Sequence, residues 1–394
     1  MADSKIRVCV DDDMKLNEIC EVYSGYALKA FNDAEDGFPV IKIGNIFMDG
    51  TLNLEECQYT TDGVNEKYYS QRGDIYIALS GATTGKIGIM DASEKYVINQ
   101  RVGIVRQKSD DIPQEYIKYF LLRQTDRILQ EAAGCAQPNI SPRQIAEYVV
   151  PDTSQEKMQE ICEVLDRIKK IIDSRKVQIS ALDNLIKARF VEMFGDPVAN
   201  EKGWTTKPLL DMGKCKNGMN FHYDDKGIEI NCLGVGDFKN LSIIDNTEEL
   251  PTILLNEMPS EEYLLKDDDI VFVRSNGNKA LVGRSLAVYP GDVPTTFSGF
   301  CIRYRKHDNE ITVPYLLRVL KTDSMRMKMA GRGANIQNLN QQILGTLVIP
   351  VPPVELQNQF AAFVTEVNKS KVKVQKALDE TQKLFDSLMQ QYFG

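Results

Sequence analysis

The pattern of apolar and polar residues after Pro151 predicts a long amphipathic helix. Alternating steps of four and three residues connect the apolar positions Ile161, Leu165, Ile168, Ile172, Ile179, Leu182 and Ile186, with Arg175 as the polar interruption. A second stretch after Pro350 repeats the pattern, with apolar members Phe360, Val364, Val367, Val374, Leu378 and Phe385 and polar interruptions Lys371 and Thr381. Such a stripe is typical of a coiled-coil helix. A helix of about 35 to 40 residues would be on the order of 55 Å long and needs a partner to bury its seam.

Shorter patterns before each long helix predict a small α+β unit. In the first half, β-like runs separated by Gly, Asn and Asp turns span Phe38 to Phe47, Gly73 to Ser80, Lys86 to Met90 and Arg101 to Arg106. They favour an irregular, mainly antiparallel sheet. A helix is then expected from Pro113 to Gly134, because proline is tolerated in a first turn and glycine can cap the end. The second half repeats this pattern with Pro314 and the run Tyr315 to Met329.

The two halves form an internal repeat. Residues 134–195 and 333–394 align without a gap at an offset of 199, and upstream Asp74, Ser80 and Gly88 align with Asp269, Ser275 and Gly283 at an offset of 195. We expect two pseudo-twofold-related α/β modules joined by two antiparallel coiled-coil helices. The predicted segments are module 1 (1–150), helix 1 (151–195), a linker (196–203), module 2 (204–349) and helix 2 (350–394). An intermolecular coiled coil in a homodimer is the alternative.

Composition adds limits to this picture. The chain has 394 residues, of which 43% are hydrophobic and 26% charged, enough for two domains with cores. It lacks an apolar run of roughly 20 residues and a signal-peptide pattern, so we expect a globular protein of the cytoplasm. The eight cysteines are scattered, and we read them as thiols rather than as disulfides or metal ligands.

The charge distribution bears on nucleic-acid binding. The net charge of −9 argues against a DNA-binding protein. However, the segment from Cys301 to Arg332 is basic, with Arg303, Arg305, Lys306, Arg318, Lys321, Arg326, Lys328 and Arg332. A local basic face permits DNA binding on an acidic protein, since the potential near the DNA matters more than the total charge. A solvated helix face is the alternative interpretation.

Catalytic motifs are absent from the sequence. The segment Ser80 to Lys86 is similar to a phosphate-binding loop, but one residue too few separates its glycines, and Ile87 stands where Ser or Thr would bind magnesium. The chain has no G-x-G-x-x-G after a strand, no Asn/Asp-Pro-Pro-aromatic methyltransferase signature, and two histidines in unrelated contexts. We therefore expect no catalytic residues and no metal site.

Two duplicated loops suit contact with DNA. The turns 80–86 and 275–281 occupy the same place between strands, and the segments 134–139 and 331–338 follow the short helix in each half. Glycine and small polar residues let backbone amides approach phosphates, while Asn and Lys side chains can read bases. Ordinary hairpin turns are the alternative. The candidate DNA-binding residues are Ser80, Thr83, Thr84, Lys86, Arg101, Gln137 and Asn139 in the first half and Arg274, Asn276, Asn278, Lys279, Arg303, Arg332 and Asn335 in the second.

Over nearly its full length the chain resembles the specificity (S) subunits of type I restriction-modification enzymes. The duplicated organisation carries this resemblance, together with the paired module openings 15–19 and 207–212, the paired segments 43–46 and 235–238, the turns 80–86 and 276–279, and the junctions at Pro151 and Pro350. The continuation Gly85-Lys86-Ile87-Gly88 of the first turn is replaced by residues 280–283 in the second, so contacts do not carry over directly to Leu281.

The resemblance implies a non-catalytic subunit that gives a larger complex its DNA specificity. Each module would read one half of a bipartite, asymmetric site in double-stranded DNA, and the helices would act as a spacer. The implied partners are two methyltransferase (M) subunits and motor-nuclease (R) subunits. Those partners, rather than this chain, would bind S-adenosylmethionine, ATP and Mg. A self-contained modification enzyme and a coiled-coil scaffold without a DNA role remain the alternatives.

Overall fold

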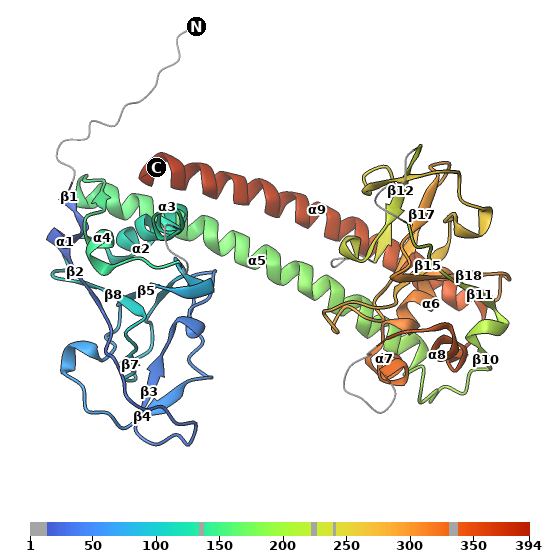
Figure 1. The fold of residues 1–394 in the computed structure, drawn as a ribbon, viewed down its shortest axis with the longest axis horizontal. Coiled ribbons are helices and arrows are strands. Elements are labelled where there is room, and N and C mark those ends of the chain that lie inside the picture. Colours follow the sequence, from blue (N-terminus) through green and yellow to red (C-terminus); the bar gives the residue numbers. More distant parts are fainter. Residues whose placement is uncertain (1–13, 134–137, 222–226, 239–241, 331–337) are drawn as a thin grey trace, which may run out of the picture. The chain divides into compact units, whose positions relative to one another are not determined.

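The computed structural model describes residues 14–133, 138–221, 227–238, 242–330 and 338–394. The chain divides into two compact units. Unit 1 consists of Met1–Lys176 with Lys376–Gly394, and unit 2 consists of Val177–Gln375. Each unit therefore contains one sheet-bearing module together with parts of both long helices (Figure 1).

The module of unit 1 contains two main sheets. An antiparallel four-stranded sheet has the order β2-β8-β5-β6, and a three-stranded sheet has the order β4-β3-β7. A further pair, β1 with β9, joins the start of the module to its end. The strands are β1 (Met14–Lys15), β2 (Cys20–Ser24), β3 (Phe38–Ile41), β4 (Gln58–Thr60), β5 (Ile75–Ala78), β6 (Ile87–Ile89), β7 (Val97–Ile98), β8 (Val102–Gln107) and β9 (Val149–Val150). The strands expected in this half are confirmed, except that the run Phe38 to Phe47 is a strand only over β3 and continues as a 3₁₀ turn.

Strand β5 is buried on both faces. Ile75 and Ile77 belong to the hydrophobic core beneath the helices, whereas Tyr76 and Ala78 belong to a second core on the opposite face. Because successive side chains of a strand point to opposite faces, a strand between two cores must be apolar throughout. The uninterrupted apolar run of β5 follows from this position.

The helix expected from Pro113 to Gly134 is two helices, so that prediction is wrong in this detail. The chain leaves α2 at Gln124, where the Thr125 hydroxyl donates to the Leu122 carbonyl oxygen at 2.9 Å. Side-chain bonds of this kind compete with the backbone bonds that would continue a helix. The helical elements of this module are α1 (Leu16–Ile19), α2 (Gln114–Arg123), α3 (Thr125–Ala132) and α4 (Pro142–Ala146), with the 3₁₀ turns η1 (Ile43–Asn45), η2 (Glu66–Tyr68) and η3 (Gly81–Thr83).

Unit 2 repeats this plan with a larger first sheet. A five-stranded sheet has the order β11-β18-β15-β16-β13, a three-stranded sheet the order β14-β12-β17, and β10 pairs with β19. The strands are β10 (Thr206–Pro208), β11 (Gly213–Asn217), β12 (Ile228–Leu233), β13 (Ile243–Ile244), β14 (Thr252–Leu255), β15 (Asp269–Val273), β16 (Ser285–Val288), β17 (Thr295–Phe297), β18 (Cys301–Lys306) and β19 (Val348–Pro350). Like β5, strand β15 alternates between two cores.

The helix expected from Pro314 to Met329 is also interrupted. Thr322 donates its hydroxyl to the Val319 carbonyl oxygen at 2.8 Å and accepts the amide of Met325 at 3.4 Å, so its side chain ends one helix and caps the next. The helical elements are α6 (Val313–Leu320), α7 (Asp323–Ala330) and α8 (Gln341–Gly345), with the 3₁₀ turns η4 (Leu209–Asp211), η5 (Val235–Asp237) and η6 (Glu261–Tyr263).

A buried ion pair supports the strand-to-turn junction in each module. Asp74 accepts two hydrogen bonds from the guanidinium of Arg106, at 2.7 and 2.6 Å, and Asp269 accepts two from Arg305, both at 2.7 Å. The side chains of Asp74 and Asp269 are 1% and 0% exposed. The alignment of Asp74 with Asp269 is therefore confirmed by the same contact in both units.

The long helices α5 (Gln155–Phe194) and α9 (Val354–Phe393) each have 40 residues, which corresponds to about 60 Å. In unit 1, the ring of Phe393 at the end of α9 packs edge-on against Tyr116 of α2, with the centroids 4.9 Å apart. Farther along, Arg175 of α5 donates to the Thr381 hydroxyl and the Ala377 carbonyl of α9. The polar interruptions Arg175 and Thr381 of the two seams therefore pair with each other.

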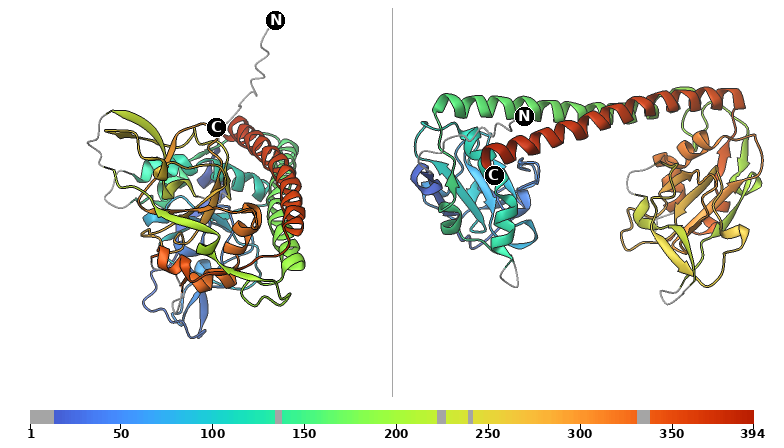
Figure 2. Two further views of the ribbon diagram at one scale, coloured as in Figure 1. Left: turned by 90° about the vertical axis from the view of Figure 1, so that its right-hand side faces the viewer. Right: turned by 90° about the horizontal axis from the view of Figure 1, so that it is seen from above.

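In unit 2, the other ends of the same helices meet (Figure 2). Phe190 of α5 contacts Phe360 of α9 with ring centroids 5.5 Å apart, and Asp183 of α5 forms an ion pair with Lys371 of α9. Residue numbers rise along α5 as they fall along α9, so the helices are antiparallel. The predicted seam residues Ile161, Leu165, Ile168, Ile172, Phe360 and Val367 are buried, and Ile179, Leu182, Val364, Val374 and Leu378 are half-buried.

Candidate nucleic-acid interface

The turn between β5 and β6 is held rigidly in unit 1. Gly81 and Gly85 both have φ of +81°, a conformation that favours glycine. The Thr84 hydroxyl donates to the carbonyl oxygen of Gly81 at 2.7 Å, and the Gly81 amide donates to that of Pro138 at 3.1 Å. Thr84 is 5% exposed, so its contribution is to the shape of the turn. Thr83 and Lys86 are half-buried beside it.

Three of the predicted DNA-binding residues lie together at this turn. Ser80 forms a β-bridge with Asn139, and the amide of Leu79, the preceding residue, donates to the carbonyl oxygen of Arg101 at 2.9 Å. The side chains of Arg101 and Asn139 are exposed. Segments that are distant in the sequence thus combine a cation, a carboxamide and a small hydroxyl on one edge of the module.

The corresponding turn of unit 2 lines a pocket. The pocket has a volume of about 540 Å³ and is lined by Val235, Ser275, Asn276, Gly277, Lys279 and Phe300. Asn276 accepts the amide of Asn278 at 2.8 Å, and Asn278 accepts that of Ala280 at 3.1 Å, so the asparagines shape the loop. Arg274 donates from Nη1 to the Gly299 carbonyl oxygen at 3.3 Å. The loop therefore presents amides and a lysine around a concave surface.

The backbone hydrogen bonds correct the alignment of the two turns. Gly85 donates to Ala78 and Gly283 donates to Val273, each at 2.9 Å, so Gly283 corresponds to Gly85 and not to Gly88. The next residues also correspond, because the carbonyl oxygens of Lys86 and Arg284 accept from those same partners. The second turn is longer, and the glycine and basic residue that end it are retained. Arg284 is thus a candidate that the sequence alignment missed.

Phe300 is a second candidate that sequence reasoning missed. Its carbonyl oxygen accepts the amide of Arg274 at 2.8 Å, as that of Arg101 accepts the amide of Leu79, so Phe300 and Arg101 correspond. Phe300 is 62% exposed although it is aromatic. The two modules thus present different chemistry at one position, a cation in unit 1 and an aromatic ring in unit 2. An exposed aromatic residue beside a polar loop was the available signal.

Arg303 does not lie at the surface. It is 6% exposed within β18, its Nε has no hydrogen-bond partner among the described residues, and burial lowers the pKa of its guanidinium. This placement favours a structural role in the sheet over a DNA contact. Of the other candidates, Gln137, Arg332 and Asn335 lie outside the described residues. The DNA contacts themselves stay predictions.

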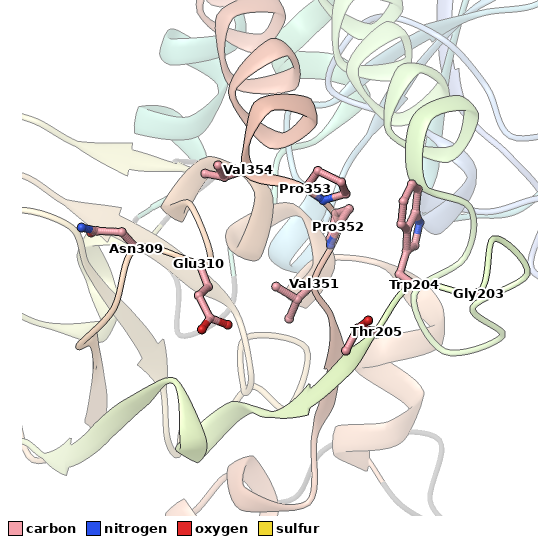
Figure 3. A pocket seen from close by; sticks show the side chains of 9 residues that line it. All are labelled: Gly203, Trp204, Thr205, Asn309, Glu310, Val351, Pro352, Pro353 and Val354. Atoms are coloured by element: carbon pink, nitrogen blue, oxygen red, sulfur yellow. The ribbon is translucent and has the colours of Figure 1, made fainter.

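A second pocket lies where α9 begins (Figure 3). It has a volume of about 660 Å³ and is lined by residues 203–205, 309–310 and 351–354. The indole of Trp204 donates to the Phe194 carbonyl oxygen at 3.1 Å, which ties the linker to the end of α5. Buried Gln357 accepts the amide of Thr312 at 2.8 Å and thereby ties α9 to the start of α6. This region carries structural contacts.

The described part of the chain has no group of three or more His, Cys, Asp or Glu side chains that could hold a metal ion. Among the described helices, none is long and apolar enough to cross a bilayer. The fold and the corresponding turns of the two units define a protein with two tandem modules that share a framework and differ at their surface.

Comparison with known proteins identifies the class. The family model of the type I restriction modification DNA specificity domain matches residues 12–183 and again residues 201–381. The chain therefore belongs to this family, as a type I restriction-modification specificity subunit with two tandem DNA specificity domains. This confirms the resemblance seen in the sequence.

Relatives and solved structures agree with this assignment. The StySPI type I specificity subunit of Salmonella potsdam is 24% identical, over 93% of this chain and 84% of its own. The MjaVIII specificity subunit of Methanocaldococcus jannaschii is 26% identical over 44% of this chain and 43% of its own. The fold is similar to that of an S subunit from M. genitalium, with a TM-score of 0.54 and 17% identity over 99% of this chain and 98% of that one. A chain from a structure on the complex assembly of a type I R-M system has a TM-score of 0.60 and 14% identity, over 97% of both chains.

Proposed function

We propose that each module reads one half of a bipartite, asymmetric site in double-stranded DNA. The observation that supports this most strongly is the pair of corresponding turns. The framework around them is the same in both units, whereas the side chains that they present differ, as Arg101 and Phe300 do. Bases are distinguished by the side chains that reach their edges. Different side chains on one framework are what two different half-sites require.

The long helices would set the spacing between the half-sites and dock the methyltransferase (M) subunits. Their seam is buried or half-buried where α5 and α9 pack on each other. Other large apolar side chains on the same helices are exposed: Val164, Ile171, Val177, Leu185 and Val191 on α5, and Val372 and Leu384 on α9. Exposed apolar surface on a helix favours contact with a further protein.

Catalysis would belong to the partners of this chain. We propose that the methyltransferase subunits bind S-adenosylmethionine and that motor-nuclease (R) subunits use ATP and Mg, while this chain holds no cofactor. The lack of methyltransferase and nucleotide-binding motifs in the sequence supports this division. The net charge of −9 supports it as well, because partners would then supply much of the positive charge around the DNA.

The test is a reconstitution with the cognate methyltransferase subunit on a randomised DNA library. We expect methylated adenines to lie in one bipartite, asymmetric sequence that depends on this chain. The chain alone with S-adenosylmethionine should transfer no methyl groups, and methyl transfer by it would contradict the non-catalytic role. If DNA binding and methylation are equally independent of sequence with and without the chain, the proposal of a specificity role fails.

A further inference from the structure

Four basic side chains from separate parts of unit 2 lie close enough to the end of α6 for their charges to act on one another. Arg318 lies in the last turn of α6, and Lys321 is the first residue after that helix. Lys371 is on α9, and Arg284 directly precedes β16. Lys321 Nζ lies 2.8 Å from the hydroxyl oxygen of Ser242. All four basic residues are partly exposed. We name these four residues the basic cluster.

Positive charge exceeds negative charge at the basic cluster. Two acids oppose the four cations. Asp323 at the start of α7 acts on Arg318, and both carboxylate oxygens of Asp183 on α5 bind Lys371, at 2.7 and 2.8 Å. Burial, followed by the charges of Arg318, Lys371 and Arg284, lowers the pKa of Lys321 to about 8, with Asp183 opposing the shift. Like charges held together in a partly desolvated place repel one another. A bound anion would relieve that repulsion.

Arg318 shows a further unsatisfied group. Its guanidinium lies 6.0 Å from the centre of the Phe190 ring, and its Nε is buried with no hydrogen-bond partner among the described residues. Burial lowers the pKa of this guanidinium. A buried donor without a partner costs free energy. The guanidinium of Arg318 is therefore held in this place at a free-energy cost.

Unit 1 has no equivalent cluster at the corresponding, described positions. Tyr116 and Tyr315 donate to the carbonyl oxygens of Pro151 and Pro350, each at 2.9 Å, which places the two α2 and α6 helices in the same register at an offset of 199. At that offset Arg318, Lys321 and Lys371 correspond to Tyr119, Leu122 and Ile172, and Arg284 corresponds to Lys86 through the turn. These positions therefore carry four basic residues in unit 2 and one in unit 1.

We propose that the basic cluster of unit 2 is an anion site that takes one backbone phosphate of the bound DNA. This inference rests on the proposed function and names a contact within it. Guanidinium and ammonium groups together are the usual partners of phosphate oxygens. A partner present in two identical copies would use corresponding surfaces of both units, whereas an asymmetric DNA site permits a contact made once.

Salt dependence tests this contact in the complex with the methyltransferase subunit. Each phosphate contact contributes a slope of about 0.9 to the fall of log K with log salt. From 50 to 200 mM salt, the complex with the natural chain should therefore lose about 3.5-fold more affinity than the Lys321→Met complex. Lys321→Arg keeps the charge and should retain the natural slope. The melting temperature of the free Lys321→Met chain should not fall, because the removal of a repelled charge offsets the loss of the exposed hydrogen bond to Ser242 and the side-chain volume is kept.

A pH series gives an independent readout. A phosphate favours protonated Lys321, so the contribution of this residue to affinity is fully present well below pH 8 and is lost as the pH rises above 8. Between pH 7 and pH 9 the natural complex should lose about tenfold in affinity through this group. The Lys321→Arg complex should not show this loss, since an arginine stays charged.

Three results would overturn the assignment. One is an equal salt slope and an equal pH profile for the natural and Lys321→Met complexes. Another is that the Lys321→Met chain assembles less well with the methyltransferase subunit, while the complex that does form binds DNA as the natural complex does. This result would assign the basic cluster to a protein partner. The third is that inorganic phosphate stabilises the natural chain while the Lys321→Met substitution leaves the salt slope of DNA binding unchanged. Failure of the proposed function itself would appear differently, as an absence of sequence preference in the natural complex.

Discussion

Lengthening the two long helices together should change the distance between the DNA half-sites without changing the bases read. The insertion points are the positions where the two units meet along the helices, after Lys176 in α5 and after Gln375 in α9. A seven-residue segment with apolar residues at steps of four and three would continue the seam. The contacts of Arg175 with Thr381 and of Asp183 with Lys371 would stay within their own units.

The magnitude follows from helix geometry. Seven residues add about 10.5 Å at 1.5 Å per residue, and they turn a straight helix by only about 20° away from a whole number of turns. At 3.4 Å per base pair, the half-sites should move apart by about three base pairs. A four-residue insertion would turn the seam by about 40° and is therefore a poorer variant.

DNA twist adds a second quantitative consequence. Three base pairs turn the outer half-site by roughly 100° about the DNA axis, because one turn contains about 10 to 10.5 base pairs. The one-heptad variant should therefore methylate its longer site more weakly. Three heptads add about 31 Å, or roughly nine base pairs, and bring the half-site nearly back to its original face of the duplex. We expect this variant to recover activity on a site with the longer spacer.

Sequencing of methylated adenines after reaction with a randomised library measures both spacers directly. The control is a heptad in α5 alone, which mismatches the seam and should lower stability without defining a new spacer. If the variant with both insertions folds and methylates the original spacing, the helices do not set the distance between half-sites. A changed base preference within a half-site would contradict the independence of the modules.

Three further predictions concern single residues. Asp74→Asn and Asp269→Asn should each lower the free energy of unfolding by about 3–5 kcal/mol, measured by urea denaturation. Each substitution leaves a partly buried guanidinium without its carboxylate, so an effect below about 1 kcal/mol would contradict this role. Arg101→Ala and Phe300→Ala should each relax base preference at one half-site, a different one for each, by about 1–3 kcal/mol per base in a binding series; relaxation of the same half-site by both would refute the correspondence of the modules. Arg303→Met should leave base preference unchanged and the unfolding free energy within about 1 kcal/mol, since it removes a buried charge with an unpaired Nε; a loss of recognition at one half-site would restore a DNA role.

Much of the fold could be predicted because its signals are local. The seam of α5 and α9 follows from heptads, and the strands follow from short apolar runs between turn residues. The same reasoning placed Pro151 and Pro350 close to the starts of the long helices, where β9 and β19 end. Local periodicity did not reveal the breaks at Gln124 and Thr322, because they depend on single side-chain hydrogen bonds within otherwise helical patterns.

The candidate site was less predictable because it is assembled from distant segments. The equivalence of Arg284 with Lys86 becomes visible only through the backbone bonds that each accepts, since the second turn is longer and shifts the alignment. The burial of Arg303 could not be predicted from a basic stretch, because it results from the position of β18 between β11 and β15, where residues 301–304 are all buried. In the same basic stretch, Arg305 forms an ion pair with Asp269, whereas Lys321 belongs to the basic cluster.

The positions that the two units share and those that they do not share fall into different physical classes. Shared positions stabilise the framework: the buried carboxylate with its arginine, the tyrosine that donates to the carbonyl oxygen of the proline before each long helix, and the glycine that ends each turn. Changing any of these would leave a buried group unpaired or strain the backbone, so each is needed wherever the module folds. Other corresponding positions can carry different side chains because the hydrogen bonds of the framework there use the backbone. Examples are Arg101 with Phe300 and Leu122 with Lys321. Divergence at such positions lets one fold present two different surfaces, and the basic cluster is one place where the two units differ in charge.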